Sequence, residues 1–137
     1  MVGEREQDDV GRHQDEETVA VTAESLLTFE NAALPLSVIS PEGNIIMANR
    51  AMRGLLGYQF SDLNGRSIYD LVVADPAALA RAWAHRIQAG EAGTRERAIR
   101  LRCADSSELS VRVSSVLVTD AQGAARYVVA RAVPERA

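Results

Sequence analysis

The chain has 137 residues, of which 47% are hydrophobic and 25% are charged, and these proportions are those of a single soluble globular domain rather than of a disordered or fibrous protein. The formal net charge of −4 comes mainly from the residues before position 18, which include seven acidic residues and only two arginines. The rest of the chain is therefore close to neutral. This balance gives no charged field suited to nucleic acid or to an anionic membrane, and the single cysteine excludes an internal disulfide.

The first 17 residues are rich in acidic side chains, have few apolar residues and show no periodicity. Such a segment buries too little apolar surface to offset the entropy of ordering, so we expect residues 1–17 to form a disordered acidic tail. This beginning is unlike a secretory signal, and no apolar run reaches membrane-spanning length. We therefore expect a cytoplasmic protein with no membrane partner.

An amphipathic pattern follows the tail, and it predicts a flanking helix over residues 18–33. Val19, Ala23, Leu26 and Leu27 fall at helical spacing. A helix must cover such an apolar stripe, either against its own domain or against the same helix of a second copy. We expect these four residues to form part of a homodimer interface.

Two short apolar runs, at residues 36–39 and 45–48, flank the turn sequence Pro41-Glu42-Gly43-Asn44. This arrangement predicts a β-hairpin. Asn49 comes directly after the second run, where its amide is placed to bond backbone groups as the chain turns into a short helix that stops at Gly57. We expect Asn49 to have a structural role.

A longer helix is predicted after Asp75-Pro76, because aspartate is a favoured cap and proline is well tolerated in the first turn. Leu79, Trp83 and Ile87 are spaced by four residues and should form its apolar face. Gly90 marks its end.

Period-two alternation dominates the rest of the chain. It occurs at residues 99–103 and 109–113. A change of phase at Ser114-Ser115, beyond which Val116 and Val118 take over the alternation, suggests a bulge or a twist there. Residues 127–133 predict the last strand. Two strands, several helices and three strands indicate an α+β fold, with one five-stranded antiparallel sheet and short helices on one face.

This order of elements, together with three stretches of sequence, resembles the PAS family. The stretches are LPLSVISPEGNIIMANRAMRGLLGY at residues 34–58, LNGRSIYDLV at 63–72 and SSELSVRVSSV at 106–116. The resemblance implies a PAS domain at residues 34–133, followed by the end of a linker at 134–137. It also implies a sensory or protein-interaction role rather than an enzyme. Accordingly, the sequence has no nucleophile with a plausible histidine and acid, no phosphate-binding glycine loop and no cluster of metal ligands.

The resemblance also gives positions at which cofactors would attach. In PAS domains that bind haem through the long helix, a histidine stands about eleven residues before the closing glycine, and here that position is Leu79. His85 is six residues further, about 240° round the helix, and we expect it at the surface. Haem is therefore disfavoured.

A flavin adduct is disfavoured by the same comparison. The reactive cysteine would follow Gly65-Arg66, where Ser67 stands instead. Cys103 belongs to an alternating strand, where a small buried hydrophobe is expected. The aromatic content of 4% is low for a stacked flavin, so we predict no cofactor.

The apolar interior is either packed solid or hollow, and the sequence leaves both alternatives open. The thioether of Met47 and the amphipathic rings of Trp83 and Tyr58 suit a small apolar or aromatic ligand, but residues of these types also fill ordinary cores. The residues expected to line a pocket are Val38, Met47, Leu56, Tyr58, Leu71, Trp83, Ile87, Ile99, Leu101, Val111 and Val113.

These patterns favour a regulatory module over an enzyme. We expect a PAS domain that forms a homodimer through its flanking helix and the outer face of its sheet, and that signals to an effector domain or partner protein, as the N-terminal part of a larger bacterial signalling protein. The alternative is a sensor that binds a small apolar or aromatic molecule in its core pocket.

Overall fold

The computed structural model describes residues 23–91 and 93–135. A helical segment at residues 23–31 comes first, within the predicted range of 18–33. The predicted tail at 1–17, Val19 and the last two residues of the predicted linker lie outside the described residues. The other elements, in chain order, are β1 (Leu36–Ile39), β2 (Ile45–Ala48), α2 (Arg50–Leu56), α3 (Phe60–Leu63), the 3-10 helix η1 (Ile68–Asp70), α4 (Pro76–Ala89), β3 (Thr94–Arg102), β4 (Glu108–Thr119) and β5 (Ala125–Pro134).

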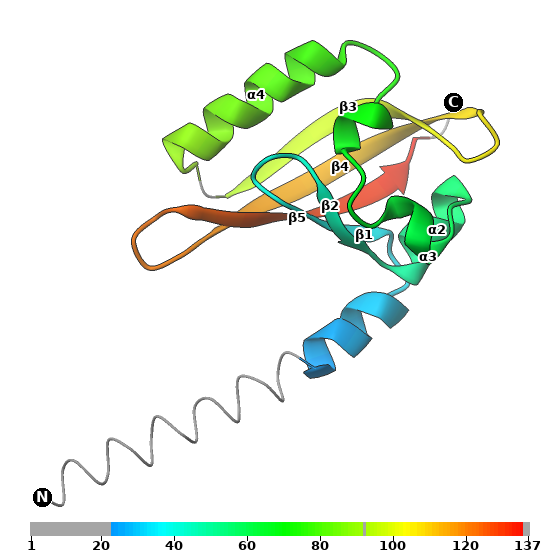
Figure 1. Cartoon of the computed structure of the whole chain (residues 1–137), viewed down its shortest axis with the longest axis horizontal. Helices are drawn as coiled ribbons and strands as arrows, with labels where there is room; N and C mark the ends of the chain where they lie inside the picture. Colours follow the sequence, from blue (N-terminus) through cyan, green and yellow to red (C-terminus); the bar gives the residue numbers. More distant parts are fainter. Residues whose placement is uncertain (1–22, 92, 136–137) are drawn as a thin grey trace, which may run out of the picture.

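The strands form one antiparallel sheet in the order β2-β1-β5-β4-β3, which confirms the predicted α+β class (Figure 1). The last strand thus lies at the centre of the sheet, between the first hairpin and the β3–β4 hairpin. Side chains of α2, α3 and η1 share one core with one face of the sheet, called here the inner face. Figure 1 shows α4 lying across the half of the sheet that β3 and β4 form.

The inward phase of β4 does not change at the two central serines. Its pairing with β5 is regular until Val118, and the one register shift falls between Val118 and Thr119. Ser115 and Leu117 are buried, whereas Val116 is 42% exposed. The predicted bulge at Ser114-Ser115 and the inward placement of Val116 and Val118 are therefore wrong. Ser115 faces inward because its hydroxyl accepts a hydrogen bond from the buried Arg86 of α4.

The first hairpin also differs from the prediction in its phase. Ser37 and Ile39 are the buried residues of β1, and Val38 pairs with Met47 across the hairpin. Because side chains alternate along a strand, Val38 and Met47 lie on the opposite, outer face and do not line an interior pocket. The expectation that Val38 faces the interior would have placed its neighbour Ser37 on the outer face, because three of the four residues in this strand are apolar and do not fix which face is buried.

Asn49 joins three parts of the fold and is fully buried. Its Oδ1 accepts hydrogen bonds from the backbone N–H groups of Leu36 and Met52, both at 2.9 Å, so it caps α2 and holds the start of β1. Its Nδ2 donates to the carbonyl oxygens of Phe29 and Leu34, both at 2.9 Å. One amide therefore anchors the segment before β1 to the domain.

The long helix begins and ends where the sequence predicts. The Asp75 side chain accepts a hydrogen bond from the N–H of Ala78 at 3.0 Å, Pro76 opens α4, and Gly90 closes it with a positive φ of 61°. No helix within the described ranges has the length and apolar composition needed to cross a membrane.

Candidate functional site

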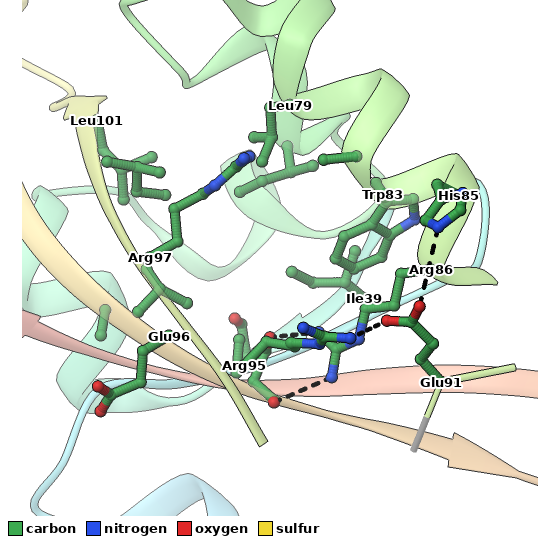
Figure 2. A pocket seen from close by; sticks show the side chains of 18 of the residues that line it. Ile39, Leu79, Trp83, His85, Arg86, Glu91, Arg95, Glu96, Arg97 and Leu101 are labelled. Atoms are coloured by element: carbon green, nitrogen blue, oxygen red, sulfur yellow. Dashed lines mark hydrogen bonds and ion pairs between the residues drawn. The ribbon is translucent and has the colours of Figure 1, made fainter. Parts of the chain in front are cut away.

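A cavity of about 390 Å³ lies between α4 and the inner face of the sheet (Figure 2). This volume falls within the range of small-molecule binding sites in proteins. Leu79 and Trp83 form its wall on α4, and Ile39, Ile99 and Leu101 face them from the strands. The space between α4 and the sheet is therefore not filled by side chains, and it is partly open to solvent.

Four of the residues expected to line a pocket do so, and they are Trp83, Ile99, Leu101 and Val113. The others are placed elsewhere by the packing of the short helices. Leu56, Leu71 and Val111 are buried in the solid part of the core. Tyr58 packs against that core and donates its hydroxyl proton to the carbonyl oxygen of Arg102 at 3.1 Å. Ile87 is half-buried on α4, outside the cavity lining.

Trp83 fixes the position of α4 over the sheet. Its indole Nε1–H donates to the carbonyl oxygen of Pro41, in the turn of the first hairpin, at 2.7 Å. The ring itself lines the cavity. A change in what occupies the cavity would therefore act on both α4 and this hairpin turn.

Arg86 is the buried residue of α4, and its side chain lines the cavity. Its Nη1 donates to the Oγ of Ser115 at 2.7 Å, and its Nη2 donates to the carbonyl oxygens of Ser115 at 3.1 Å and Gly93 at 3.0 Å. Its Nε is buried and has no hydrogen-bond partner among the described residues. Burial, and secondarily the positive charge of Arg95, lower the pKa of Arg86 from its ordinary value.

The other charged groups of the cavity lining come from β3 and from the turn that precedes it. Arg95 forms an ion pair with Glu91, whose other oxygen lies 3.8 Å from Nε2 of His85. The Arg97 side chain extends towards α4 near Leu79 in Figure 2. Within residues 23–91 and 93–135, no carboxylate lies within 4.0 Å of a side-chain nitrogen of Arg86 or Arg97.

Sequence reasoning missed Arg86, Ser115 and Arg97 as lining residues. The available signal was spacing: Arg86 follows Trp83 by three residues and so shares its face of α4. Arg97 precedes Ile99 and Leu101 at period two and so shares their face of β3. Polarity argued against the placement of Arg86, since arginines are seldom buried, whereas Arg97 stays exposed although it lines the cavity.

The positions considered for a haem ligand and for the cysteine of a flavin adduct are occupied by Leu79 and Ser67. Leu79 presents an aliphatic side chain to the cavity, and the His85 side chain is 78% exposed. Ser67 caps η1 by accepting a hydrogen bond from the N–H of Tyr69, while Cys103 lies just beyond β3. No group of three or more potential metal-ligating side chains is found among the described residues.

The outer face of the sheet carries a row of apolar residues across four strands. Val116 on β4 pairs with Val129 on β5, which pairs with Val38 on β1, which pairs with Met47 on β2. Tyr127, beside this row, is 38% exposed. These five residues are called here the outer patch.

The helical segment at 23–31 is held by an ion pair. Arg53 of α2 donates from both Nη atoms to the two carboxylate oxygens of Glu30, at 2.8 and 3.0 Å. Ala23, Leu26 and Leu27, three of the residues expected at a dimer interface, are exposed on this segment. Their apolar surface is not covered by the described part of the domain.

Comparison with known proteins agrees with this architecture. The family model described as the PAS fold matches residues 27–132. A PAS domain of an HTR-like protein from Haloarcula marismortui superposes with a TM-score of 0.70 at 20% identity, covering 90% of this chain and 99% of that one. A PAS domain from Colwellia psychrerythraea gives a TM-score of 0.72 at 16% identity, with coverage of 84% and 97%.

A third similar structure is the PAS-B domain of Drosophila melanogaster Cycle with bound ethylene glycol. Its TM-score is 0.65 at 21% identity, covering 74% of this chain and all of that one. At these identities the superpositions establish the fold alone, and no curated protein matches the sequence. The family match, however, covers most of the chain and agrees with the strand order and helix positions described above. The chain belongs to the PAS family.

Proposed function

We propose that this PAS domain is a sensory module of a signalling protein and acts as a homodimer formed through the outer patch and the segment at 23–31. The row of apolar residues across β4, β5, β1 and β2 carries this proposal. Contiguous exposed apolar surface marks interaction sites in soluble proteins, because water is displaced when a partner covers it.

A second copy of the chain is the occupant that suits this surface. In a two-fold dimer the same patch contributes from both sides, and a row of valines on a pleated face is complementary to itself. The segment at 23–31 is fixed to the domain by Glu30 and adds the exposed Leu26 and Leu27. Covering both surfaces at once accounts for apolar residues that the domain leaves exposed.

The sheet gives a physical route from the cavity to this interface. Inner and outer side chains alternate along β4, so Val113 and Ser115 line the cavity while Val116 belongs to the outer patch. A molecule or partner that changes packing on the inner face would move the same strand. Signalling by this route requires that the bound molecule or partner has a different affinity for each of two packing arrangements of the domain. A separate effector domain or partner protein would respond to the change of arrangement.

The dimer is tested by sedimentation equilibrium of the full chain and of Val116→Glu. A glutamate in the outer patch places two like charges in the interface, so we expect the variant to be monomeric at concentrations at which the natural chain is dimeric. Gln88→Glu, on an exposed position of α4, is the matched control and should remain dimeric. A monomeric natural chain, or an unchanged dimer in Val116→Glu, would refute the proposed interface.

A second candidate function is small-molecule sensing, and the cavity of about 390 Å³ favours it. Ligand binding to the folded state raises the melting temperature, so a screen of small molecules by thermal shift is the direct test. Ile99→Trp would fill the cavity from β3 and should abolish any shift seen with the natural chain. A shift that persists in this variant would place the binding site elsewhere.

A further inference from the structure

The cavity contains a buried positive charge with no compensating negative charge among the described residues. Arg86 is only 8% exposed, and each acceptor bonded to it is a neutral oxygen of Ser115 or Gly93. Its Nε has no acceptor. A desolvated guanidinium costs free energy unless an anion approaches it, and a buried charge is only weakly screened by salt.

Arg97 supplies a second cation to the cavity lining, and its side chain, unlike that of Arg86, is exposed to solvent. It occupies an inner-face position on β3, and its guanidinium lies near Leu79 at the wall of the cavity (Figure 2). No described carboxylate pairs with it, although its neighbour Arg95 is paired with Glu91. The other acid of the lining, Glu96, accepts a hydrogen bond from Ser114 at 3.1 Å and so is engaged by a residue of the outer face.

Most of the remaining wall is apolar, with Ser37, Ser115 and His85 as its other polar residues. Six of its residues, Ile39, Met52, Leu79, Trp83, Ile99 and Leu101, enclose the space beside these two arginines. A molecule that fits this wall needs a hydrophobic body, and one that offsets the charge needs an anionic end. Desolvating a doubly charged group against so much apolar surface would be more costly than desolvating a single charge, so a monoanion is favoured over a phosphate.

We propose that the cavity binds a small monocarboxylate with an apolar body, whose carboxylate is held by Arg97 and attracted by the buried charge of Arg86. The inference rests on the ligand-sensor candidate above and names its ligand class. A carboxylate accepts two parallel hydrogen bonds from a guanidinium, so the acid should bind more tightly than a neutral compound of the same shape.

Trp83 provides the readout, because it is the one tryptophan of the chain and lines the cavity. The probes are octanoate and 3-phenylpropanoate, each compared with its primary amide, in fluorescence titrations of the full chain. We expect each carboxylate to bind at least about tenfold more tightly than its amide, a difference that one charge-assisted pair supplies. Replacing Arg97 by glutamine should remove most of this preference.

Two further variants complete the test. Arg102→Gln removes an exposed arginine at an outer-face position of the same strand and should keep the preference. Arg86→Met removes the buried charge and should weaken carboxylate binding more than amide binding, with its fold checked by circular dichroism. If Arg86→Met does not fold, the comparison of Arg97→Gln with Arg102→Gln decides the matter.

The outcomes separate this inference from the functions on which it rests. Equal affinity for acid and amide, or a preference that survives Arg97→Gln, overturns the carboxylate site and leaves a cavity for neutral ligands. No response to any of the four probes overturns the carboxylate site, and the thermal-shift screen then decides the ligand-sensor candidate separately. The dimer proposal is unaffected by either result, because sedimentation of Val116→Glu tests it independently.

Discussion

The Nη1 of Arg86 lies 2.7 Å from the Oγ of Ser115, and this hydrogen bond joins α4 to the inner face of β4. Ser115 is 9% exposed, so neither partner has ready access to water in place of the other. The pair holds the two walls of the cavity together. It also explains why a serine occupies an inward position of a strand whose other inward residues are apolar.

The first prediction concerns this pair. Ser115→Ala leaves a donor of a buried guanidinium without an acceptor and should lower the free energy of unfolding by about 1–3 kcal/mol. Arg86→Met combined with Ser115→Ala removes both polar groups and should cost less than the sum of these two single changes. Urea denaturation of the four proteins measures the coupling. Additive effects would mean that the bond does not contribute to the stability of the domain.

The second prediction concerns Asn49. Asn49→Ala removes five side-chain hydrogen bonds to buried or part-buried backbone groups and should lower the free energy of unfolding by about 2–4 kcal/mol. Asn44→Ala, at an exposed turn position, is the control and should change it by less than about 0.5 kcal/mol. Denaturant unfolding distinguishes them, and similar values for both would exclude the structural role of Asn49.

Asn49→Asp separates the two halves of this role. The carboxylate still accepts from the N–H groups that cap α2, but it faces the carbonyl oxygens of Phe29 and Leu34 with no donor. We expect the segment at 23–31 to detach while the domain stays folded. Limited proteolysis should then cut this segment faster than in the natural chain, and an unchanged cutting rate would contradict the anchoring.

The third prediction compares two glycines with similar backbone conformations. Gly43 has a φ of +93°, and a Cβ added there would lie 2.6 Å from Cε2 of Tyr69. Gly65 has a φ of +84°, with nothing within 4 Å of an added Cβ. Gly65→Ala should therefore cost only the left-handed conformation, about 1–2 kcal/mol, and Gly43→Ala should cost about 1–3 kcal/mol more. Equal losses in thermal or urea unfolding would show that the Tyr69 ring moves aside freely.

The fourth prediction concerns pH. The hydrogen bond from Arg53 lowers the pKa of Glu30 below its ordinary value of 4.5. The folded state therefore binds the proton less readily than the unfolded state, so the stabilisation is fully present above pH 4.5 and is lost as the pH falls through the lower, folded value. We expect the segment at 23–31 to loosen in that acidic range.

Carbon NMR of the Glu30 carboxyl group checks this expectation. The titration midpoint should lie below 4.5 in the natural chain and move up towards that value in Arg53→Gln. Arg66→Gln, which does not contact Glu30, should leave the midpoint where it is. A natural midpoint at or above the ordinary value would mean that the ion pair is not formed in solution.

Boundaries of the elements were predictable where a single residue has a steric or capping preference. Asp75-Pro76 and Gly90 bound α4, and Gly57 ends α2, because a cap or a positive φ is a local property. The α+β class followed from the order of these elements. Local signals of this kind do not depend on tertiary partners.

Strand phase and the cavity were less predictable because they depend on partners distant in the chain. Ser37 and Ser115 read as outward residues, but both are buried. The buried position of Ser115 depends on Arg86, which is 29 residues away in sequence. The sequence did not predict the buried Arg86 for the same reason, since polarity alone predicts that an arginine lies at the surface.

The central claim is that two copies meet through the outer patch, and an isotope-filtered NOE experiment on an equal mixture of ¹³C-labelled and unlabelled chains tests it most directly. We predict contacts between chains from the methyl groups of Val116 and Val129 and from the ring of Tyr127. Contacts that arise only from α4, or none at a concentration at which the protein is dimeric, would contradict the account.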